Sequence, residues 1–220
     1  MAGLDPAQLL EPAFSWSNDV WLGADVVVRC NYGRFPGAFR HEASVLALLP
    51  DAVPHAEVLA QDTDAKGEWM VLRCVTGQRW TQAWPALDDD QRRSVVAELA
   101  HAITAVHAIQ LPASFTNPWL NEALKHDDRL HEAHHPPVEA IPRLLDRVRS
   151  TGRTDEGLLS ALAARADGLR SACPDQDRRV LVHADMHWDN LLVRDGHLVA
   201  ILDWEGARRG LSLIHISEPT

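Results

Sequence analysis

The stretch from Val180 to Glu205, VLVHADMHWDNLLVRDGHLVAILDWE, constrains the fold of this chain more than any other. Apolar, β-rich segments run from Leu191 to Val193 and from Leu198 to Leu202, and Asp195-Gly196 lies between them. An Asp-Gly pair between two such segments is the strongest short signal for a β-hairpin. The sequence therefore predicts a hairpin, entered through a loop that follows an apolar strand.

A two-residue turn at this pair would place Asn190 beside Ile201 on the opposite strand, close to Asp203. A side-chain amide and a carboxylate then converge next to Asp185. Mg²⁺ prefers oxygen ligands and fills its remaining positions with water and substrate phosphates. We therefore expect Asn190 and Asp203 to be metal ligands, which leaves the Asp185 carboxylate free to accept a proton from a hydroxyl.

The order His183-x-Asp185-x-x-x-x-Asn190, followed by a hairpin and then Asp203 before an aromatic residue, resembles the catalytic loop and metal-binding Asp of kinases. The variant found here, HADMHWDN and then ILDWE, resembles the aminoglycoside phosphotransferase family of small-molecule kinases. That family usually has Gly where Ala184 stands. The alternative interpretation is that Asp185 and Asn190 are ordinary loop formers and Asp203 a strand cap. The hairpin and the position of Asp203 favour the kinase-like interpretation.

The resemblance covers residues 14–210 and implies an α+β, two-lobe, protein-kinase-like fold, with a small β-rich N-lobe and a helical C-lobe that carries the hairpin. It implies ATP and Mg²⁺ as cofactors and transfer of the γ-phosphoryl group to a hydroxyl of a small molecule, with Asp185 as the catalytic base. The acceptor would be aminoglycoside-like or another amino-alcohol, so antibiotic resistance is among the functions open to the chain. Its identity, and the preference for ATP over GTP, are not encoded in these motifs.

The resemblance makes residues 1–76 the nucleotide-binding N-lobe. Arg29 follows three valines and lies where a strand Lys usually contacts the nucleotide phosphates. Glu42 falls on a predicted helix from Gly37 to Leu49, where a helix Glu usually holds that cation. Arg is permanently charged and can bind two phosphate oxygens, so the chemistry survives the exchange. If the resemblance is set aside, Arg29 is interpreted as a surface Arg at the end of a strand and Glu42 as a solvated helix carboxylate.

No Gly-rich phosphate loop precedes the Arg29 strand. The segment there is Ser15-Trp16-Ser17-Asn18-Asp19, and the resembled family often covers phosphates with a Ser/Asn loop. Ser17 and Asn18 are therefore candidate nucleotide-binding residues through hydroxyl, amide and backbone N–H groups. A plain turn would have the same composition.

Residues 77–84 read as a polar-aromatic hinge or linker, and residues 85–210 as a partial helical C-lobe. Apolar residues at helical spacing predict a core helix from Asp88 to Ile109, and further helices from Pro142 to Arg149 and from Thr154 to Ala172. Acidic residues at the start of the first of these favour the helix dipole.

Two other functions compete with the kinase interpretation. His131-Glu132-x-x-His135 has the spacing of a zinc metallopeptidase helix, but Pro136 and Pro137 follow at once and stop the helix there. The chain would alternatively be a catalytically dead, kinase-like nucleotide-binding module. Bound zinc would favour the first, and nucleotide binding without turnover the second.

The last ten residues, 211–220, read LSLIHISEPT and match the conceptual translation of a sequencing-library adapter. In the resembled family further helices follow this point. We therefore expect a chain truncated at about Gly210 that continues into a non-native tail. A native amphipathic tail is the other interpretation.

Composition excludes several partners. The net charge is −10 and no basic cluster occurs, so nucleic acid is not an expected partner. The 3 cysteines have no disulfide or metal-site spacing. No apolar run reaches the ~18 residues of a membrane span and the start lacks signal-peptide features. We expect a cytoplasmic protein; nothing in the sequence indicates its oligomeric state.

Overall fold

The computed structural model describes residues 10–15, 18–32, 36–118, 141–170 and 179–211. The chain divides into two compact units. The first comprises Met1–Pro118 with Val180–Gly210, and the second comprises Trp119–Arg179 with Leu211–Thr220. The candidate residues Arg29, Glu42 and Asp185 to Asp203 all fall in the first unit.

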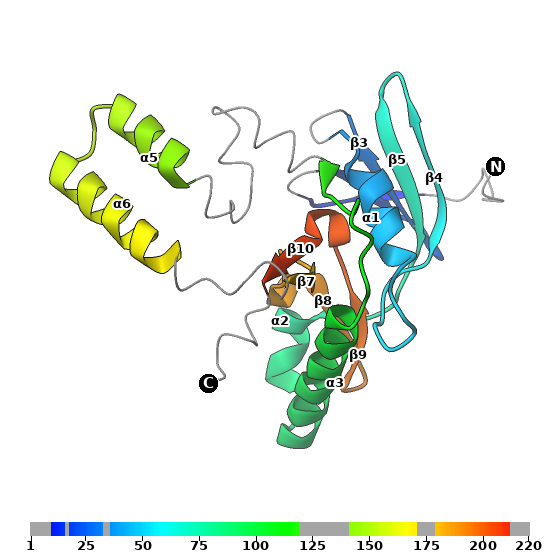
Figure 1. The fold of residues 1–220 in the computed structure, drawn as a ribbon. Helices are drawn as coiled ribbons and strands as arrows, with labels where there is room; N and C mark the ends of the chain where they lie inside the picture. The colour runs from blue at the N-terminus through cyan, green and yellow to red at the C-terminus, as the bar shows by residue number, and fades with distance from the viewer. Residues whose placement is uncertain (1–9, 16–17, 33–35, 119–140, 171–178, 212–220) are drawn as a thin grey trace. The chain divides into compact units, whose positions relative to one another are not determined.

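The first unit opens with a five-stranded antiparallel sheet, coloured blue to cyan in Figure 1, of order β1-β2-β3-β5-β4. Its strands are β1 Glu11–Ala13, β2 Asp19–Leu22, β3 Val26–Asn31, β4 Val58–Asp64 and β5 Gly67–Arg73. Arg29 lies on the central strand β3, opposite Val20 on one side and Met70 on the other. Pairing on both sides fixes the backbone from which its side chain extends.

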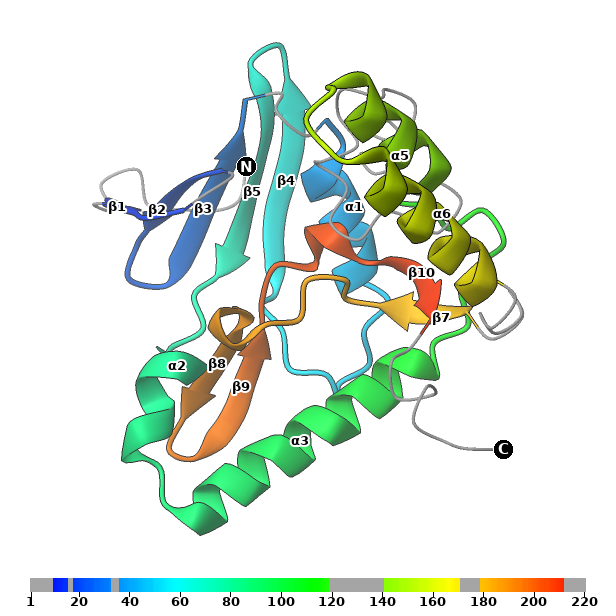
Figure 2. The same cartoon turned by 90° about the vertical axis from the view of Figure 1, so that its left-hand side faces the viewer.

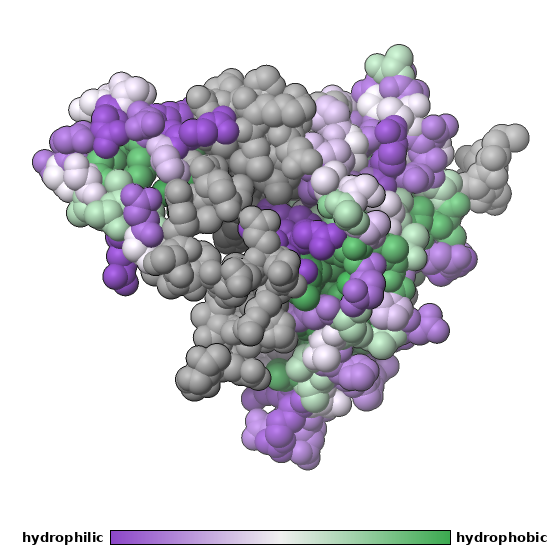
Figure 3. All heavy atoms as spheres, viewed as in Figure 1, coloured by the Kyte–Doolittle hydropathy of each residue, from purple (hydrophilic) through white to green (hydrophobic). Residues whose placement is uncertain are grey.

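The edge strand β4 exposes Gln61 to Asp64 to solvent, and this edge is largely hydrophilic at the upper right of Figure 3. Charged side chains on an edge strand discourage pairing with another chain. The sheet therefore ends at β4 without an aggregation-prone edge.

Helix α1 (Ala38–Leu46) follows Gly37, which has the positive φ of 84° that favours glycine. The cap comes from the sheet: Oε1 of Glu68 on β5 accepts from Gly37 N at 2.9 Å and Oε2 accepts from Phe39 N at 3.1 Å. The predicted helix is present but ends at Leu46, three residues before the expected end. The buried Glu68 side chain thus fixes the helix that carries Glu42.

The segment interpreted as a hinge or linker, residues 77–84, contains strand β6 (Gln78–Arg79) and helix α2 (Trp80–Ala83), and the 3₁₀ turn η1 (Trp84–Ala86) begins at its last residue. These elements are too short to produce a periodic pattern in the sequence; the 5%-exposed Trp80 anchors them to the core. Helix α3 (Asp89–His107) follows and begins with a reciprocal capping box between Asp88 and Gln91. The predicted core helix is therefore confirmed.

The stretch from Val180 to Glu205 and the residues that flank it form six elements. They are strand β7 (Arg179–Val182), the 3₁₀ turn η5 (Trp188–Asn190), the hairpin strands β8 (Leu191–Arg194) and β9 (His197–Ile201), the 3₁₀ turn η6 (Trp204–Gly206) and strand β10 (Arg208–Leu211). β8 lies between β6 and β9 in a three-stranded sheet, and β10 pairs with β7. The turn residues Asp195 and Gly196 both have positive φ, 54° and 77°. This is the conformation that a two-residue hairpin turn favours, so the predicted hairpin is confirmed.

The predicted register needs one correction. A bulge lets Leu192 pair with Ala200 while Val193 pairs with Leu198, so β9 holds one extra residue, Val199. Leu191, and not Asn190, consequently faces Ile201. The backbone O of Asn190 instead accepts from Leu202 N at 2.8 Å, which brings Asn190 one residue nearer to Asp203 than expected.

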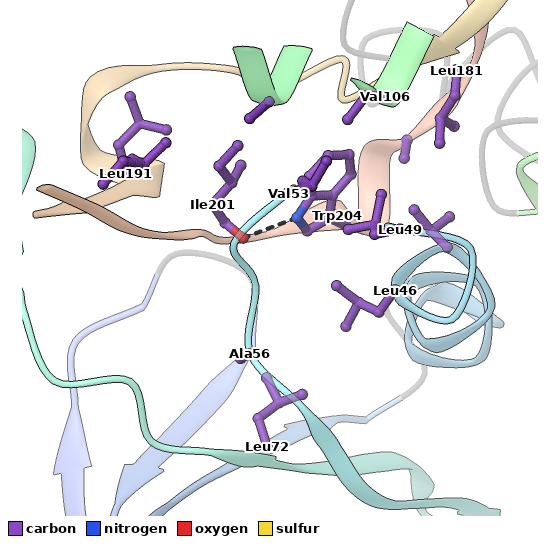
Figure 4. Close-up of a cluster of buried hydrophobic side chains, with 14 of the residues drawn as sticks. Leu46, Leu49, Val53, Ala56, Leu72, Val106, Leu181, Leu191, Ile201 and Trp204 are labelled. Carbon is purple, nitrogen blue, oxygen red and sulfur yellow. Dashed lines mark hydrogen bonds between the residues drawn. The ribbon is translucent and has the colours of Figure 1, made fainter. Parts of the chain in front are cut away.

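One hydrophobic core holds these elements together, as Figure 4 shows. Trp204 is fully buried at its centre, and its indole Nε1 donates to Ile201 O at 2.9 Å. Side chains from each surrounding element pack into the same cluster: Leu46, Leu49, Leu72, Val106, Leu181 and Leu191. The residue after Asp203 is thus anchored in the core, and the truncation Trp204→Ala would cost about 3–5 kcal/mol.

In the second unit, α5 (Ile141–Ser150) and α6 (Glu156–Arg170) pack against each other, as in Figures 1 and 2. Arg149 pairs with Glu156 at 3.0 Å across the connection. Both helices occur where the sequence predicts them.

No helix among the described residues is long and apolar enough to cross a membrane. The predicted tail lies almost wholly outside the described residues, and only Leu211 ends β10.

Candidate active site

Arg29 joins two parts of the first unit. Its Nη1 donates to Glu42 Oε2 at 2.7 Å, while its Nη2 donates to Asp203 Oδ1 at 2.9 Å and to Glu205 Oε2 at 3.2 Å. Glu42 is fixed from its other oxygen, which accepts from Trp204 N at 3.2 Å. Two candidate residues predicted as a pair are therefore brought together, and the candidate metal ligand Asp203 shares the same guanidinium.

Burial and charge act against each other in this cluster. Burial alone would lower the pKa of Arg29, but the carboxylates of Glu42, Asp203 and Glu205 outweigh it and raise that pKa. Burial raises the pKa of Glu42, with Arg29 opposing. Burial and then Asp203 raise the pKa of Glu205 to about 8. A single guanidinium thus balances three carboxyl groups, which leaves the cluster able to accept a further cation.

His183 braces the catalytic loop. Its Nδ1 accepts from Asp185 N at 3.3 Å, so the neutral ring carries its proton on Nε2, which donates to Leu202 O at 2.8 Å. The side chain is 4% exposed and burial lowers its pKa. His183 therefore connects the loop to the end of β9.

Asp185 and Asn190 are in direct contact. The Asn190 amide nitrogen donates to Asp185 O at 3.0 Å and to its Oδ2 at 3.4 Å. That use of the nitrogen leaves the amide oxygen as the atom with which Asn190 can bind a cation. The Asp185 side chain is 42% exposed, so its carboxylate is accessible to a substrate.

Two backbone positions in the site are unusual. Ala184 has a φ of 68° and Asp203 a φ of 66°, both in the left-handed region. Asp tolerates this conformation better than most residues. For Ala it is unfavourable, and for Gly it would not be. At position 184, where the resembled family usually has Gly, the backbone conformation therefore favours Gly over Ala.

Oxygen donors suited to Mg²⁺ gather around Asp203. Carboxylate oxygens of Glu42, Asp203 and Glu205 lie within 4.8 Å of one another. Hard oxygen donors of this kind fit Mg²⁺, and the amide oxygen of Asn190 belongs to the same donor class. Glu205 was not among the predicted site residues, although an acid two positions after Asp203 was a signal that could have identified it.

Other contributors come from distant parts of the sequence. Asn117 Nδ2 donates to Glu205 O at 2.9 Å and to Ala207 O at 3.3 Å, and His41 Nε2 contacts Ala207 O at 2.6 Å. They hold the segment after Asp203, and no local pattern marks them. Asn18 Nδ2 donates to Glu205 Oε2 at 3.3 Å, which places it at the site.

Four predicted positions fall in parts of the chain that the structure does not describe. Ser17 lies outside the described residues, as do the metallopeptidase candidates His131, Glu132 and His135. Of the two candidates in the expected phosphate-covering loop, Ser17 and Asn18, the structure describes Asn18.

The sheet carries Arg29, and helix α1 carries its partner Glu42. A loop with Asp185 and Asn190, a hairpin and then Asp203 follow later in the chain, and together these features define a protein-kinase-like α+β fold. The chain belongs to the phosphotransferase enzyme family, whose sequence model matches residues 10–213. The resemblance to aminoglycoside phosphotransferases and the predicted fold class are thereby confirmed. No curated protein matches the sequence.

Solved structures share this fold. APH(2″)-IIa in a ternary complex with streptomycin and ATP has a TM-score of 0.66 and 14% identity, over 92% of this chain and 67% of that chain. Aminoglycoside phosphotransferase APH(2″)-Ib with bound ADP has a TM-score of 0.63 and 15% identity, with the same coverage. APH(4)-Ia has a TM-score of 0.60 and 20% identity, over 91% and 67%. At these identities the likeness shows the fold alone.

Proposed function

We propose that the protein is an ATP-dependent phosphotransferase that moves the γ-phosphoryl group to a hydroxyl of a small molecule. The observation that carries this proposal is one continuous network. Arg29 connects Glu42 to Asp203, and Asn190, whose backbone pairs with the residue before Asp203, donates to Asp185. Residues from the sheet, from α1 and from the hairpin therefore meet at one place.

Asp185 is the proposed base. Its accessible carboxylate accepts the hydroxyl proton as the acceptor oxygen bonds to phosphorus and the bond to the leaving ADP oxygen breaks. Phosphoryl transfer has a loose transition state, so catalysis is mostly positioning and charge stabilisation. The Asn190 and His183 contacts supply the positioning, because they fix the loop around Asp185.

The nucleotide phosphates would meet Arg29, which Glu42 holds in place. Asn18 and Ser17 are the proposed cover over those phosphates. Asn190 and Asp203 would hold Mg²⁺, which when bound neutralises charge on the phosphate oxygens. Nη2 of Arg29 donates to Asp203 Oδ1, so the cation that would meet the phosphates also contacts a proposed metal ligand.

The acceptor is proposed to be an aminoglycoside-like molecule or another amino-alcohol. The structures with the same fold include complexes with streptomycin, gentamicin and hygromycin B. The net charge of −10 on this chain also favours cationic acceptors. Resistance to an antibiotic would follow if the acceptor is one.

The test incubates the purified protein with ATP or GTP, Mg²⁺ and a panel of hydroxylated amines, and detects phosphorylated product by mass spectrometry. Asp185→Asn keeps the shape of the side chain but removes the proton acceptor, so kcat should fall by about 10²–10⁴ with nucleotide affinity unchanged. Asp195→Asn is the matched control, since it makes the same exchange at the hairpin turn, where Asn-Gly is equally favourable.

Two outcomes would contradict the proposal. Turnover by Asp185→Asn at the parent rate would show that this carboxylate is not the base. Nucleotide-dependent thermal stabilisation without phosphorylation of any acceptor would instead identify a kinase-like nucleotide-binding module.

A further inference from the structure

A row of indole rings runs from η1 through α2 to the catalytic loop. Trp84 stacks on Trp80 with 4.8 Å between ring centroids and 13° between planes, and Trp80 contacts Trp188 at 5.1 Å. The guanidinium of Arg92 lies 5.3 Å from the Trp84 ring and covers the other end. Trp80 is 5% exposed but Trp188 is 57% exposed. The row therefore ends in an indole that faces solvent.

The position of Trp188 is fixed by independent contacts. The next residue, Asp189, accepts from Thr81 Oγ1 through its side chain and from Arg79 Nη1 at 3.3 Å through its backbone O. Both donors lie on the β6–α2 segment, whose strand pairs with β8. The Trp80 ring and the hydrogen bonds to Asp189 together fix the Trp188 indole, so it would bind a ligand at little cost in side-chain entropy.

Trp188 is three residues from Asp185 in the same loop, whereas Arg29 and Asp203, the proposed phosphate and metal groups, belong to other elements. Met186, between them, is also partly exposed at 37%. The loop that carries the proposed base therefore also presents exposed apolar and aromatic side chains within three positions of it. Folding alone gains nothing from exposing these side chains.

We propose that Trp188 is a specificity-determining residue that binds the ammonium end of the acceptor on its indole face. This inference rests on the proposed phosphotransferase function and adds the group that would select the acceptor. The face of an indole attracts cations electrostatically, and the attraction is stronger when the cation is desolvated. The nearby Asp185 carboxylate and the acidic chain have the complementary charge. Arg92 over Trp84 is the same kind of contact at the other end of the row.

The experiment measures steady-state kinetics of Trp188→Leu and Trp188→Phe with an amine-bearing acceptor and with its uncharged analogue, in which a hydroxyl replaces the amine. Leu keeps apolar bulk but lacks the π face, so the KM for the amine should rise by about 3- to 30-fold. The KM for ATP, the kcat and the KM for the uncharged analogue should stay within about twofold, and Phe should recover most of the loss. A folding defect or a lost apolar contact would change the constants for both acceptors, whereas a lost cation–π contact changes only the KM for the amine.

Trp84→Leu is the matched control, because it removes an indole from the same row at the end remote from Asp185. An unchanged amine KM in Trp188→Leu overturns the inference while leaving the phosphotransferase intact. A rise in the KM for ATP instead would assign Trp188 to the nucleotide base. If the parent protein phosphorylates no amine in the panel, the proposed function itself fails, and this inference with it.

Discussion

At the scale of single residues, Ala184 stores strain next to the proposed base. Its φ of 68° costs an L-residue about 1–2 kcal/mol, while Gly would add about 0.4–1 kcal/mol of unfolded-chain entropy. Ala184→Gly should therefore stabilise the protein by about 0.5–1 kcal/mol, measured by urea denaturation at constant slope. Ala52→Gly, in an exposed turn without positive φ, is the control and should destabilise it. A loss of stability on Ala184→Gly would show that the strain is relieved elsewhere.

Glu205 should make stability depend on pH. Its unfolded pKa is 4.5, and burial followed by Asp203 raises the folded pKa to about 8. Between these values the folded state binds a proton that the unfolded chain has released, so this contribution to stability is present at low pH and lost as pH rises through about 8. Glu205→Gln should flatten the dependence and be more stable than the parent at pH 9, by about 1 kcal/mol or more. Parallel stability profiles from pH 5 to 9 would contradict it.

At the scale of elements, α1 depends on a cap from another strand. Glu68→Ala leaves Gly37 N and Phe39 N without their acceptor, which should destabilise the protein by about 1–3 kcal/mol in chemical denaturation. Because α1 carries Glu42, the KM for ATP should also rise. Asp88→Ala removes the cap of α3, which carries no candidate residue; it should cost about 1 kcal/mol and leave that KM unchanged. Equal effects of both variants on the KM would mean that α1 is not specifically positioned by Glu68.

The elements with strong local signals could be predicted from the sequence. The hairpin followed from Asp195-Gly196, and α3 followed from apolar spacing over nearly twenty residues. The bulge at Val199 did not, because register also depends on the side-chain packing of β9 against α3 and the core. Strands β1, β2 and β6 and helix α2 are two to four residues long, which is too short for a pattern of apolar residues to show a helical or strand period.

At the scale of the whole molecule, the sequence indicated which candidate residues meet but not what supports them. Arg29 and Glu42 could be paired only through the resemblance, and the contact of Arg29 with Asp203 spans most of the chain. Asn117 and Glu68 could not be found at all, because their partners are backbone groups in distant segments. Backbone acceptors and donors leave no mark on side-chain patterns, so such positioning contacts become visible only in three dimensions.

Binding of Mg²⁺ and nucleotide should stabilise the whole molecule through Asp203. A ligand at 100 times its Kd stabilises a protein by about 2.7 kcal/mol, so ATP with Mg²⁺ should raise the Tm more than ATP with EDTA. Asp203→Asn keeps an oxygen for Arg29 but removes the carboxylate charge, so it should abolish most of the Mg²⁺-dependent increase and little of the Mg²⁺-independent one. Asp62→Asn, on the exposed edge of the sheet, is the control and should behave as the parent. If Asp203→Asn reduces both increments equally, the carboxylate supports the fold and not the ion.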